Sequence, residues 1–148
     1  MQHERITVEG CTMQDIVIKT EQRLAAEEFL AVLERSGLAE RRPVGAPERI
    51  AAMLAHANLI ITARDEGKIV GVSRSVTDFA YCCYCSDLAV DRDYQGRGIG
   101  RRLLEATQAA LHPKATLYLI AGPKAVSYYE HIGMMRNDRC FAIAAEKL

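Results

Sequence analysis

Hydrophobic and polar positions follow two different periods along this chain. Residues 25–36 carry apolar side chains at positions 25, 26, 29, 30, 32 and 33, and Gly37 follows, which is typical of an amphipathic helix with a glycine terminator. Pro47 precedes a second helical pattern at 48–57, and proline is well tolerated in the first turn of a helix. The first third of the chain is therefore expected to contain two helices.

Runs rich in β-branched residues predict strands in most of the remainder. The runs 58–64 and 69–76 are separated by Asp65-Glu66-Gly67-Lys68, which predicts a hairpin with glycine in the turn. We expect further strands at 15–19, 81–90, 116–121 and 139–145, and helices at 99–111 and 124–132. Because consecutive strands are followed by strands that alternate with helices, the fold class is α+β with a mixed sheet. Residues 1–13 fit either a loose leader or an extra strand.

Composition indicates one domain and excludes some classes of partner. The chain has 148 residues, which is enough for a single core, and its 19 basic and 19 acidic side chains give no field that attracts nucleic acid or an anionic membrane. No apolar run approaches the length of a membrane span, and the first residues lack the order of a signal peptide, so we expect a cytoplasmic protein. Arg41-Arg42 is expected in a solvated loop.

Five cysteines, an odd number, argue against a disulfide framework. The cluster Cys82-Cys83-Tyr84-Cys85 lacks a second ligand pair at the spacing that zinc sites use, so no metal is expected. In a strand, Cys83 and Cys85 face one side and Cys82 the other. We therefore interpret the cluster as part of a buried strand with reduced thiols.

The segment Gln95-Gly96-Arg97-Gly98-Ile99-Gly100 joins a strand-like run to a helix-like run. Glycines let backbone N–H groups approach an anion, and the N-terminus of the following helix adds unpaired N–H groups and positive charge. A dinucleotide fingerprint would place the third glycine one residue later, and a nucleotide P-loop would end in Gly-Lys-Ser/Thr, where this chain has Gly100-Arg101-Arg102. The loop therefore predicts a phosphate site of another kind.

The glycine loop, preceded by Leu-Ala-Val-Asp-Arg-Asp-Tyr, resembles the acyl-CoA-binding motif of the GNAT superfamily of N-acetyltransferases. Residues 125–134 resemble the family's Ala-x-x-Phe-Tyr-Glu-x-x-Gly-Phe helix and turn, and the two motifs stand in the family's order. The resemblance implies one N-acetyltransferase domain over 1–148. It also implies a mostly antiparallel sheet flanked by about four helices and splayed in the middle at the acyl-CoA site.

The resemblance also assigns roles to individual residues. Tyr129 aligns with the tyrosine that protonates the departing thiolate, and a phenol is protonated at neutral pH. Asp87 is a candidate contact for the acceptor amine, and a structural carboxylate at the strand end is an equal alternative. Binding of acetyl-CoA is assigned to the backbone of one strand and to the loop that follows it, namely Leu88, Ala89, Val90, Gln95, Gly96, Arg97, Gly98, Gly100 and Arg101.

Three positions depart from the family pattern. Gly122 stands where many members have Asn, Met134 replaces a common Phe, and Ser86 stands where some members have Glu, which leaves the general base open. The resemblance implies an acetyl-CoA-dependent N-acetyltransferase that transfers acetyl directly to a primary amine of a small molecule or protein. Acetyl-CoA would be the co-substrate, without a metal, and a homodimer is frequent in the family. The alternative is an acyl-CoA-binding regulatory module with little turnover.

Overall fold

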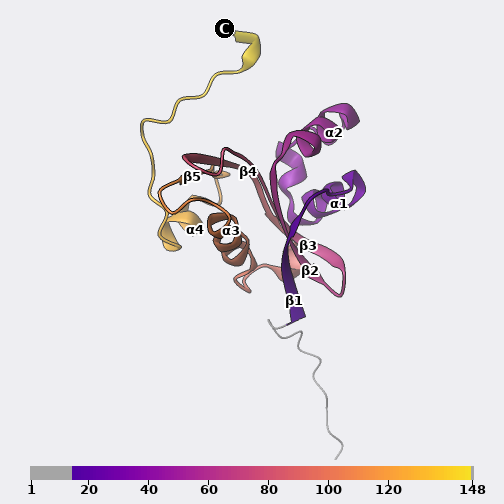
Figure 1. Ribbon diagram of the computed structural model, residues 1–148. Helices are drawn as coiled ribbons and strands as arrows, with labels where there is room; N and C mark the ends of the chain where they lie inside the picture. The colour runs from indigo at the N-terminus through magenta and orange to yellow at the C-terminus, as the bar shows by residue number, and fades with distance from the viewer. Residues whose placement is uncertain (1–14, 148) are drawn as a thin grey trace, which may run out of the picture.

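The computed structural model describes residues 15–147, and its centre is one sheet of five strands (Figure 1). The strands lie in chain order across the sheet, and every neighbouring pair is antiparallel except β4 and β5, which are parallel. Their bounds are β1 Ile16–Glu21, β2 Leu59–Asp65, β3 Lys68–Thr77, β4 Cys82–Val90 and β5 Thr116–Tyr118. The predicted mixed, mostly antiparallel sheet is confirmed.

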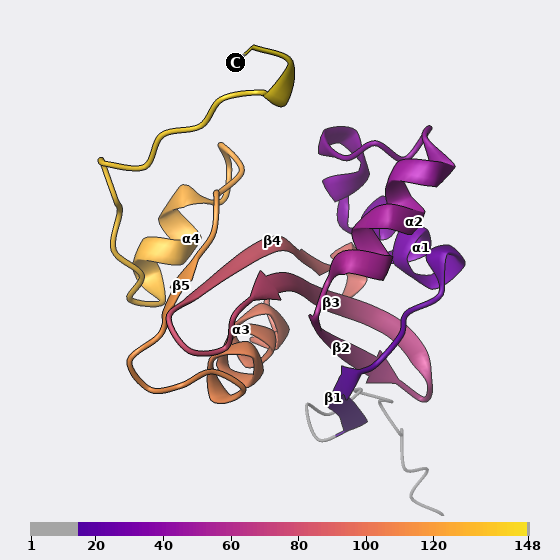
Figure 2. The same cartoon turned by 45° about the horizontal axis from the view of Figure 1, so that its top comes forward.

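Helices cover both faces of this sheet (Figure 2). The helices α1 (Ala26–Ser36) and α2 (Pro47–His56), with the short 3-10 helix η2 (Leu38–Arg41) between them, lie on one face. On the other face lie α3 (Ile99–Ala109) and α4 (Val126–His131). Two further 3-10 turns are η3 (Arg92–Tyr94) and η4 (Ala145–Lys147).

Each face of the sheet has its own apolar core. Phe29, Val32 and Leu33 of α1 pack with Ile60 and Val72 on one face. On the other face, Ile99 and Leu103 of α3 pack with residues of β2 and β3, including Ile61, Ala63 and Val70. Because both faces are buried, α1 and α3 are held in fixed positions against the two sides of β3 and β4.

The local signals in the sequence have their expected structural effects. Gly37 ends α1 in the left-handed region at φ 85°, and its N–H donates to Glu34 O at 3.1 Å. Pro47 begins α2. Glu66 and Gly67 both have positive φ, 46° and 85°, as a two-residue type I′ hairpin turn requires. The predicted helices and hairpin are confirmed.

A bulge and a separation of strands interrupt the sheet at β4. Arg74 pairs with Asp87 and Ser75 pairs with Cys85, so Ser86 is an extra residue in β4. Pairing between β4 and β5 covers only Cys82 to Tyr84. Beyond Tyr84, no strand among residues 15–147 pairs with β4 on the β5 side. The expected opening in the middle of the sheet is therefore present.

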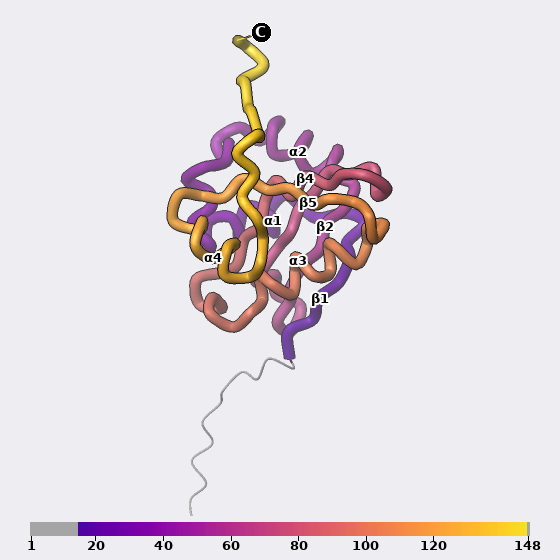
Figure 3. Tube along the Cα trace, turned by 90° about the vertical axis from the view of Figure 1, so that its left-hand side faces the viewer, coloured from indigo at the N-terminus to yellow at the C-terminus, as the bar shows by residue number. Residues whose placement is uncertain are grey.

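The predicted strand at 139–145 is wrong for this structure. These residues form no strand, and the C-terminal segment runs away from the body of the molecule (Figures 1 and 3). β5 is also shorter than the predicted 116–121, since on its outer side no described strand extends its pairing. The predicted leader at 1–13 lies outside the described residues. Within 15–147 no helix combines the length and apolar character needed to cross a bilayer.

Candidate active site

A cavity of about 410 Å³ lies where β4, the glycine loop and α4 meet. It lies next to the part of β4 that has separated from β5. Its lining is mostly apolar and aromatic, with exposed backbone at the glycines. The lining residues are Leu88, Val90, Tyr94, Gln95, Gly96, Gly98, Ile99, Gly100, Lys124, Ala125, Tyr128 and Tyr129.

The glycine loop presents backbone N–H groups to this cavity. Gly96 and Gly98 have φ of 76° and 75°, a conformation that L side chains rarely adopt, and Gly98 is the N-cap of α3. The first helical bond of α3 runs from Arg102 N to Gly98 O at 3.1 Å. The N–H groups of the preceding first turn therefore have no partner within the helix, and together with the helix dipole they suit an anion.

Three side chains fix the shape of this loop. Asp91 is buried, forms an ion pair with Arg35 at 2.9 Å, and accepts a hydrogen bond from Asp93 N at 3.0 Å. Gln95 Nε2 donates to Val90 O at 2.9 Å. Tyr94 donates its hydroxyl proton to Asp65 at 2.5 Å and so links the loop to the β2–β3 hairpin. Asp91, Gln95 and Tyr94 therefore hold the loop before any ligand arrives.

On the cavity side of β4, beyond Tyr84, no described strand pairs with the backbone, and the Val90 carbonyl accepts from the Gln95 side chain. Asp91 N donates to Val70 O at 2.8 Å, so the backbone of Asp91 faces β3. In an antiparallel pair every second residue faces the same neighbour, and the N–H and C=O of Ala89 therefore also point toward β3. The backbone groups of Leu88 and Val90 point the other way, toward the gap and the cavity. Of the three predicted strand residues, Leu88 and Val90 line the cavity, and Ala89 is buried against β3.

Tyr129 reaches the cavity from α4. Its ring contacts that of Tyr128 edge to face, with 5.3 Å between centroids. Burial, with a smaller contribution from the Cys85 thiol, raises the pKa of Tyr129 to about 12. Its phenol therefore keeps its proton at neutral pH and is able to donate it, as the resemblance implies for this position.

Tyr128, the neighbour of Tyr129 in α4, also lines the cavity. Its hydroxyl oxygen lies 2.9 Å from the place that a Cβ on Gly100 would take. Gly100 therefore leaves room for the Tyr128 hydroxyl beside the first turn of α3.

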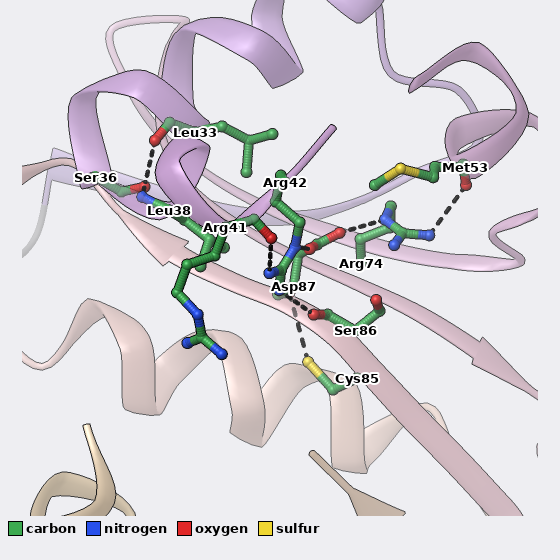
Figure 4. A network of polar contacts seen from close by, with 10 residues as sticks. All are labelled: Leu33, Ser36, Leu38, Arg41, Arg42, Met53, Arg74, Cys85, Ser86 and Asp87. Atoms are coloured by element: carbon green, nitrogen blue, oxygen red, sulfur yellow. Dashed lines mark hydrogen bonds and ion pairs between the residues drawn. The ribbon is translucent and has the colours of Figure 1, made fainter. Parts of the chain in front are cut away.

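Asp87 lies outside the cavity and is fully buried (Figure 4). One carboxylate oxygen pairs with Arg42 and the other with Arg74. Arg42 also donates to the carbonyl of Ser86 at 2.7 Å, and Arg74 donates to Met53 O at 3.1 Å. This network joins α2 and the end of η2 to β3 and β4. Because arginines take both oxygens, this geometry favours the structural alternative for Asp87, and its contact with an acceptor amine stays a prediction.

The Asp87 network overturns the expectation for Arg42, and it shows that a carboxylate in a buried strand was itself a sign of a buried partner. Arg42 is not in a solvated loop, because its guanidinium is largely buried against Asp87 and Ser86. Asp87 belongs to the alternating series of buried residues in β4, with Cys83, Cys85 and Ala89. The bulge at Ser86 turns Asp87 to the α1 side with Ala89 and leaves Cys85 on the α3 side, near Ser73. A carboxylate at that position in the alternation indicates a buried cation partner.

The three arginines in and after the glycine loop contact other parts of the protein. Arg97 lies over the Tyr94 ring at 5.0 Å and donates to Asp93 O, and Arg101 pairs with Glu105 at 2.9 Å on the surface. Arg102 donates to Ile16 O at 3.0 Å on the β1 side. None of these three arginines lines the cavity, whereas Lys124, which the sequence analysis missed, does. The only sequence feature that pointed to Lys124 is its position directly before residues 125–134, which resemble the family's helix and turn.

Gly122, one of the departures from the family pattern, also has a structural reason. The guanidinium of Arg41 occupies the space that a Cβ on Gly122 would need. Any larger residue at position 122 would therefore displace Arg41.

The thiols of the cysteine cluster are arranged as the strand alternation predicts. Cys83 and Cys85 are buried and Cys82 is exposed. Burial raises the pKa of both buried thiols, which disfavours the nucleophilic thiolate. Among residues 15–147 no group of three His, Cys, Asp or Glu side chains is placed to hold a metal ion.

Comparison with known proteins agrees with this geometry. A family model described as "Acetyltransferase (GNAT) domain" matches residues 20–141. The chain therefore belongs to the GNAT family of acetyltransferases.

Two curated relatives match part of the chain. GCN5-related N-acetyltransferase 2, chloroplastic, of Arabidopsis thaliana is 32% identical over 72 residues, which are 47% of this chain and 28% of the relative. Histone acetyltransferase TAP1 of Glycine max is 22% identical over 135 residues, 82% of this chain and 57% of the relative. The chain thus spans between about a quarter and three fifths of the length of these two curated relatives.

Solved structures share the fold. A GNAT-family acetyltransferase of Streptococcus pneumoniae superposes with a TM-score of 0.71 at 25% identity, covering 87% of this chain and 96% of its own. An aminoglycoside acetyltransferase from an uncultured soil metagenomic sample gives a TM-score of 0.67 at 20% identity, covering 89% and 96%. At such identities the likeness to the second structure concerns the fold alone.

Proposed function

We propose that this protein is an acetyl-CoA-dependent N-acetyltransferase that transfers acetyl directly to a primary amine of a small molecule or protein. One observation carries the proposal: a single cavity connects the first turn of α3 to the phenol of Tyr129 along the free edge of β4. Phosphate recognition, thioester positioning and proton donation are the three tasks of this reaction. The cavity provides a group for each of them.

In this proposal the two ends of acetyl-CoA meet different parts of the cavity. The pyrophosphate lies at the N–H groups of the glycine loop, and the pantetheine and thioester lie along the backbone of Leu88 and Val90. Lys124 is the one basic side chain among the twelve described lining residues, and no carboxylate there repels the phosphates. The amine nitrogen attacks the thioester carbon, the C–S bond breaks, and Tyr129 gives its proton to the leaving thiolate. The nitrogen releases one proton as it becomes an amide, and water returns a proton to the Tyr129 oxygen.

The acceptor amine has to arrive uncharged. No carboxylate or imidazole is among the described residues that line the cavity, so no side chain there is placed to remove a proton from an ammonium group. The amine therefore loses its proton to water before it attacks.

The test is a thiol-release assay with acetyl-CoA over a panel of amines, alongside calorimetric titration of acetyl-CoA. The panel contains aminoglycosides, polyamines and peptides with a free N-terminus or lysine, because structural neighbours are named as an aminoglycoside acetyltransferase and a ribosomal-protein-alanine N-acetyltransferase. Direct transfer predicts intersecting lines when both substrates are varied, whereas parallel lines would indicate a covalent acetyl-enzyme. Binding without thiol release for any amine would favour the regulatory module.

A further inference from the structure

The side chain of Arg41 crosses the opening between β4 and the chain that follows β5. Arg41 is the last residue of η2, and its neighbour Arg42 is bonded to Ser86 of β4. The Cζ atom of Arg41 lies 3.6 Å from the place that a Cβ on Gly122 would take, in the loop between β5 and α4. Figure 2 shows β4 between α2 on one side and β5 with α4 on the other. The guanidinium of Arg41 therefore lies where the sheet is open.

Arg41 is held in place, and its charge is not used within the described chain. Arg42 Nη1 donates to the carbonyl of Arg41 at 2.8 Å, so the network around Asp87 also fixes the backbone of Arg41. Figure 4 shows the guanidinium of Arg42 turned toward Asp87 and that of Arg41 pointing away from it. Arg41 is exposed, and no carboxylate among residues 15–147 forms an ion pair with it. Its charge is therefore available to an anion from outside the protein.

The loop that Arg41 contacts leads directly to the proposed proton donor. Ala125 N donates to Gly122 O at 2.9 Å, and Tyr129 N donates to Ala125 O at 3.3 Å. Ala125 and Tyr129 both line the cavity. Burial raises the pKa of Tyr129, and the Arg42 guanidinium opposes part of that rise, so this arginine is within electrostatic range of the phenol. Arg41 therefore lies beside the end of the cavity at which the proposed acetyl transfer takes place.

Positive charge exceeds negative charge where η2 meets β4. Three guanidinium groups gather there around one carboxylate, namely Arg41, Arg42 and Arg74 around Asp87. Lys124 adds a further positive charge in the cavity wall, where no described lining residue is acidic. Glu40, which precedes Arg41, is exposed and forms no ion pair with a described residue. An acceptor with a negative charge is therefore attracted to this region, and one with a second positive charge is repelled.

We propose that Arg41 binds a carboxylate of the acceptor, so that the acceptors of this protein are amines that also carry a carboxylate. A planar guanidinium matches a carboxylate with two parallel N–H···O bonds. In the proposed reaction acetyl-CoA lies on the α3 side of the opening, along Leu88 and Val90, so the amine arrives from the η2 side and passes Arg41. The assignment rests on the proposed N-acetyltransferase activity and adds the chemical class of its acceptor.

The test compares acceptors that differ only in a carboxylate. The pairs are glycine and glycinamide, β-alanine and β-alaninamide, and 4-aminobutanoate and 4-aminobutanamide. Thiol release gives kcat/KM for each acid and its amide, and the ratio of the two is measured in the wild type and in Arg41→Gln. Because the pKa of each amine is the same for both proteins, it cancels in this comparison. Arg41→Gln is expected to lower the ratio about tenfold for the best pair, mainly through the KM of the acid, as for the loss of a hydrogen bond to a charged group.

Four variants separate recognition of a carboxylate from other effects of Arg41. Arg49→Gln is the matched control, because Arg49 is an exposed arginine on α2, and loss of the same charge there should leave the ratio unchanged. Arg41→Lys should retain part of the ratio, since it keeps the charge without the planar fork. Arg41→Glu should favour 1,4-diaminobutane over the acids. Gly122→Ala, which displaces the Arg41 guanidinium, should lower the ratio in the same direction as Arg41→Gln.

The outcomes distinguish this assignment from the proposed function. Thiol release with equal ratios in the wild type and Arg41→Gln, whether or not the melting temperature falls, overturns the carboxylate site and leaves the acetyltransferase in place. If no amine releases thiol, calorimetry of β-alanine and 4-aminobutanoate with the CoA-loaded protein decides. Binding that is lost in Arg41→Gln supports the carboxylate site, and binding that is equal in both proteins, or absent from the wild type, overturns it.

Discussion

The Nη2 atom of Arg42 donates a 2.7 Å hydrogen bond to the carbonyl oxygen of Ser86, the residue that bulges from β4. A bulge leaves its extra residue without a ladder partner, and here the guanidinium of Arg42 supplies one while its Nε pairs with Asp87. The position of the following residues, including Leu88 and Val90 at the cavity, therefore depends on a residue that precedes α2. Asp87 pairs with the same guanidinium and so has a structural role, and the predictions begin with it.

Asp87→Asn should destabilise the fold by about 3 kcal/mol, because it leaves two arginines without the charge that compensates their burial. Denaturant unfolding measures this loss, and Glu105→Gln in the exposed Arg101–Glu105 pair is the control, with an expected change below about 0.5 kcal/mol. Kinetic constants of the folded fraction should stay near those of the wild type. A stable Asp87→Asn protein with a raised acceptor KM would instead restore the acceptor contact expected from the sequence.

Tyr129→Phe should leave acetyl-CoA affinity intact and reduce kcat by roughly 10²- to 10⁴-fold, the range for loss of a general acid. The substitution keeps the ring that contacts Tyr128 and removes only the hydroxyl. Tyr128→Phe is the matched control on the same helix and should have a much smaller effect. Equal turnover in wild type and Tyr129→Phe would mean that water or another group protonates the thiolate.

The pH dependence of kcat/KM should reflect the pKa of the acceptor amine and not the pKa of a group of the protein. Since no base is among the described lining residues, the rate should rise about tenfold per pH unit until the pKa of the amine is reached. The pKa of Tyr129, raised to about 12, keeps the phenol protonated through this rise. The measurement compares two acceptors with different pKa values, and an identical apparent pKa for both would reveal a titrating group of the protein.

Gly98→Val should weaken acetyl-CoA binding severely, because a side chain at this N-cap obstructs the approach of phosphate to the first turn of α3. Positive φ makes the substitution strained in itself, so Gly67→Val in the β2–β3 turn is the control, at φ 85° and with open space around it. Both variants should lose stability, and only Gly98→Val should lose affinity in calorimetry. Unchanged affinity in folded Gly98→Val would exclude the loop as the phosphate site.

Much of the fold was predictable because its signals are local. Gly37, Pro47 and Gly67 each determine a backbone conformation in their own turn, and the boundaries that they predict agree with the structure. The strand at 139–145 failed for a different reason. An apolar alternation indicates that a segment belongs in a sheet, but it contains no information on which edge the segment meets.

The lining of the cavity was predictable where the contiguous glycine loop forms it, and less so where the arrangement depends on side chains that are distant in the sequence. Gly96, Gly98 and Gly100 line the cavity as expected, because their loop is one contiguous segment. Arg42 reaches Asp87 across 45 positions of the chain, and no local pattern indicates such a pairing. Similarly, helical geometry directs Arg102 toward β1 although Arg97 is only five positions away.

The aromatic lining of the cavity has a practical optical consequence. The chain contains six tyrosines and no tryptophan, and Tyr94, Tyr128 and Tyr129 are cavity residues. Half of the tyrosines, which are the main fluorescent residues of a protein without tryptophan, therefore line the cavity that a ligand would occupy. Partial quenching of tyrosine emission is therefore expected when a ligand occupies the cavity, and no tryptophan emission masks it.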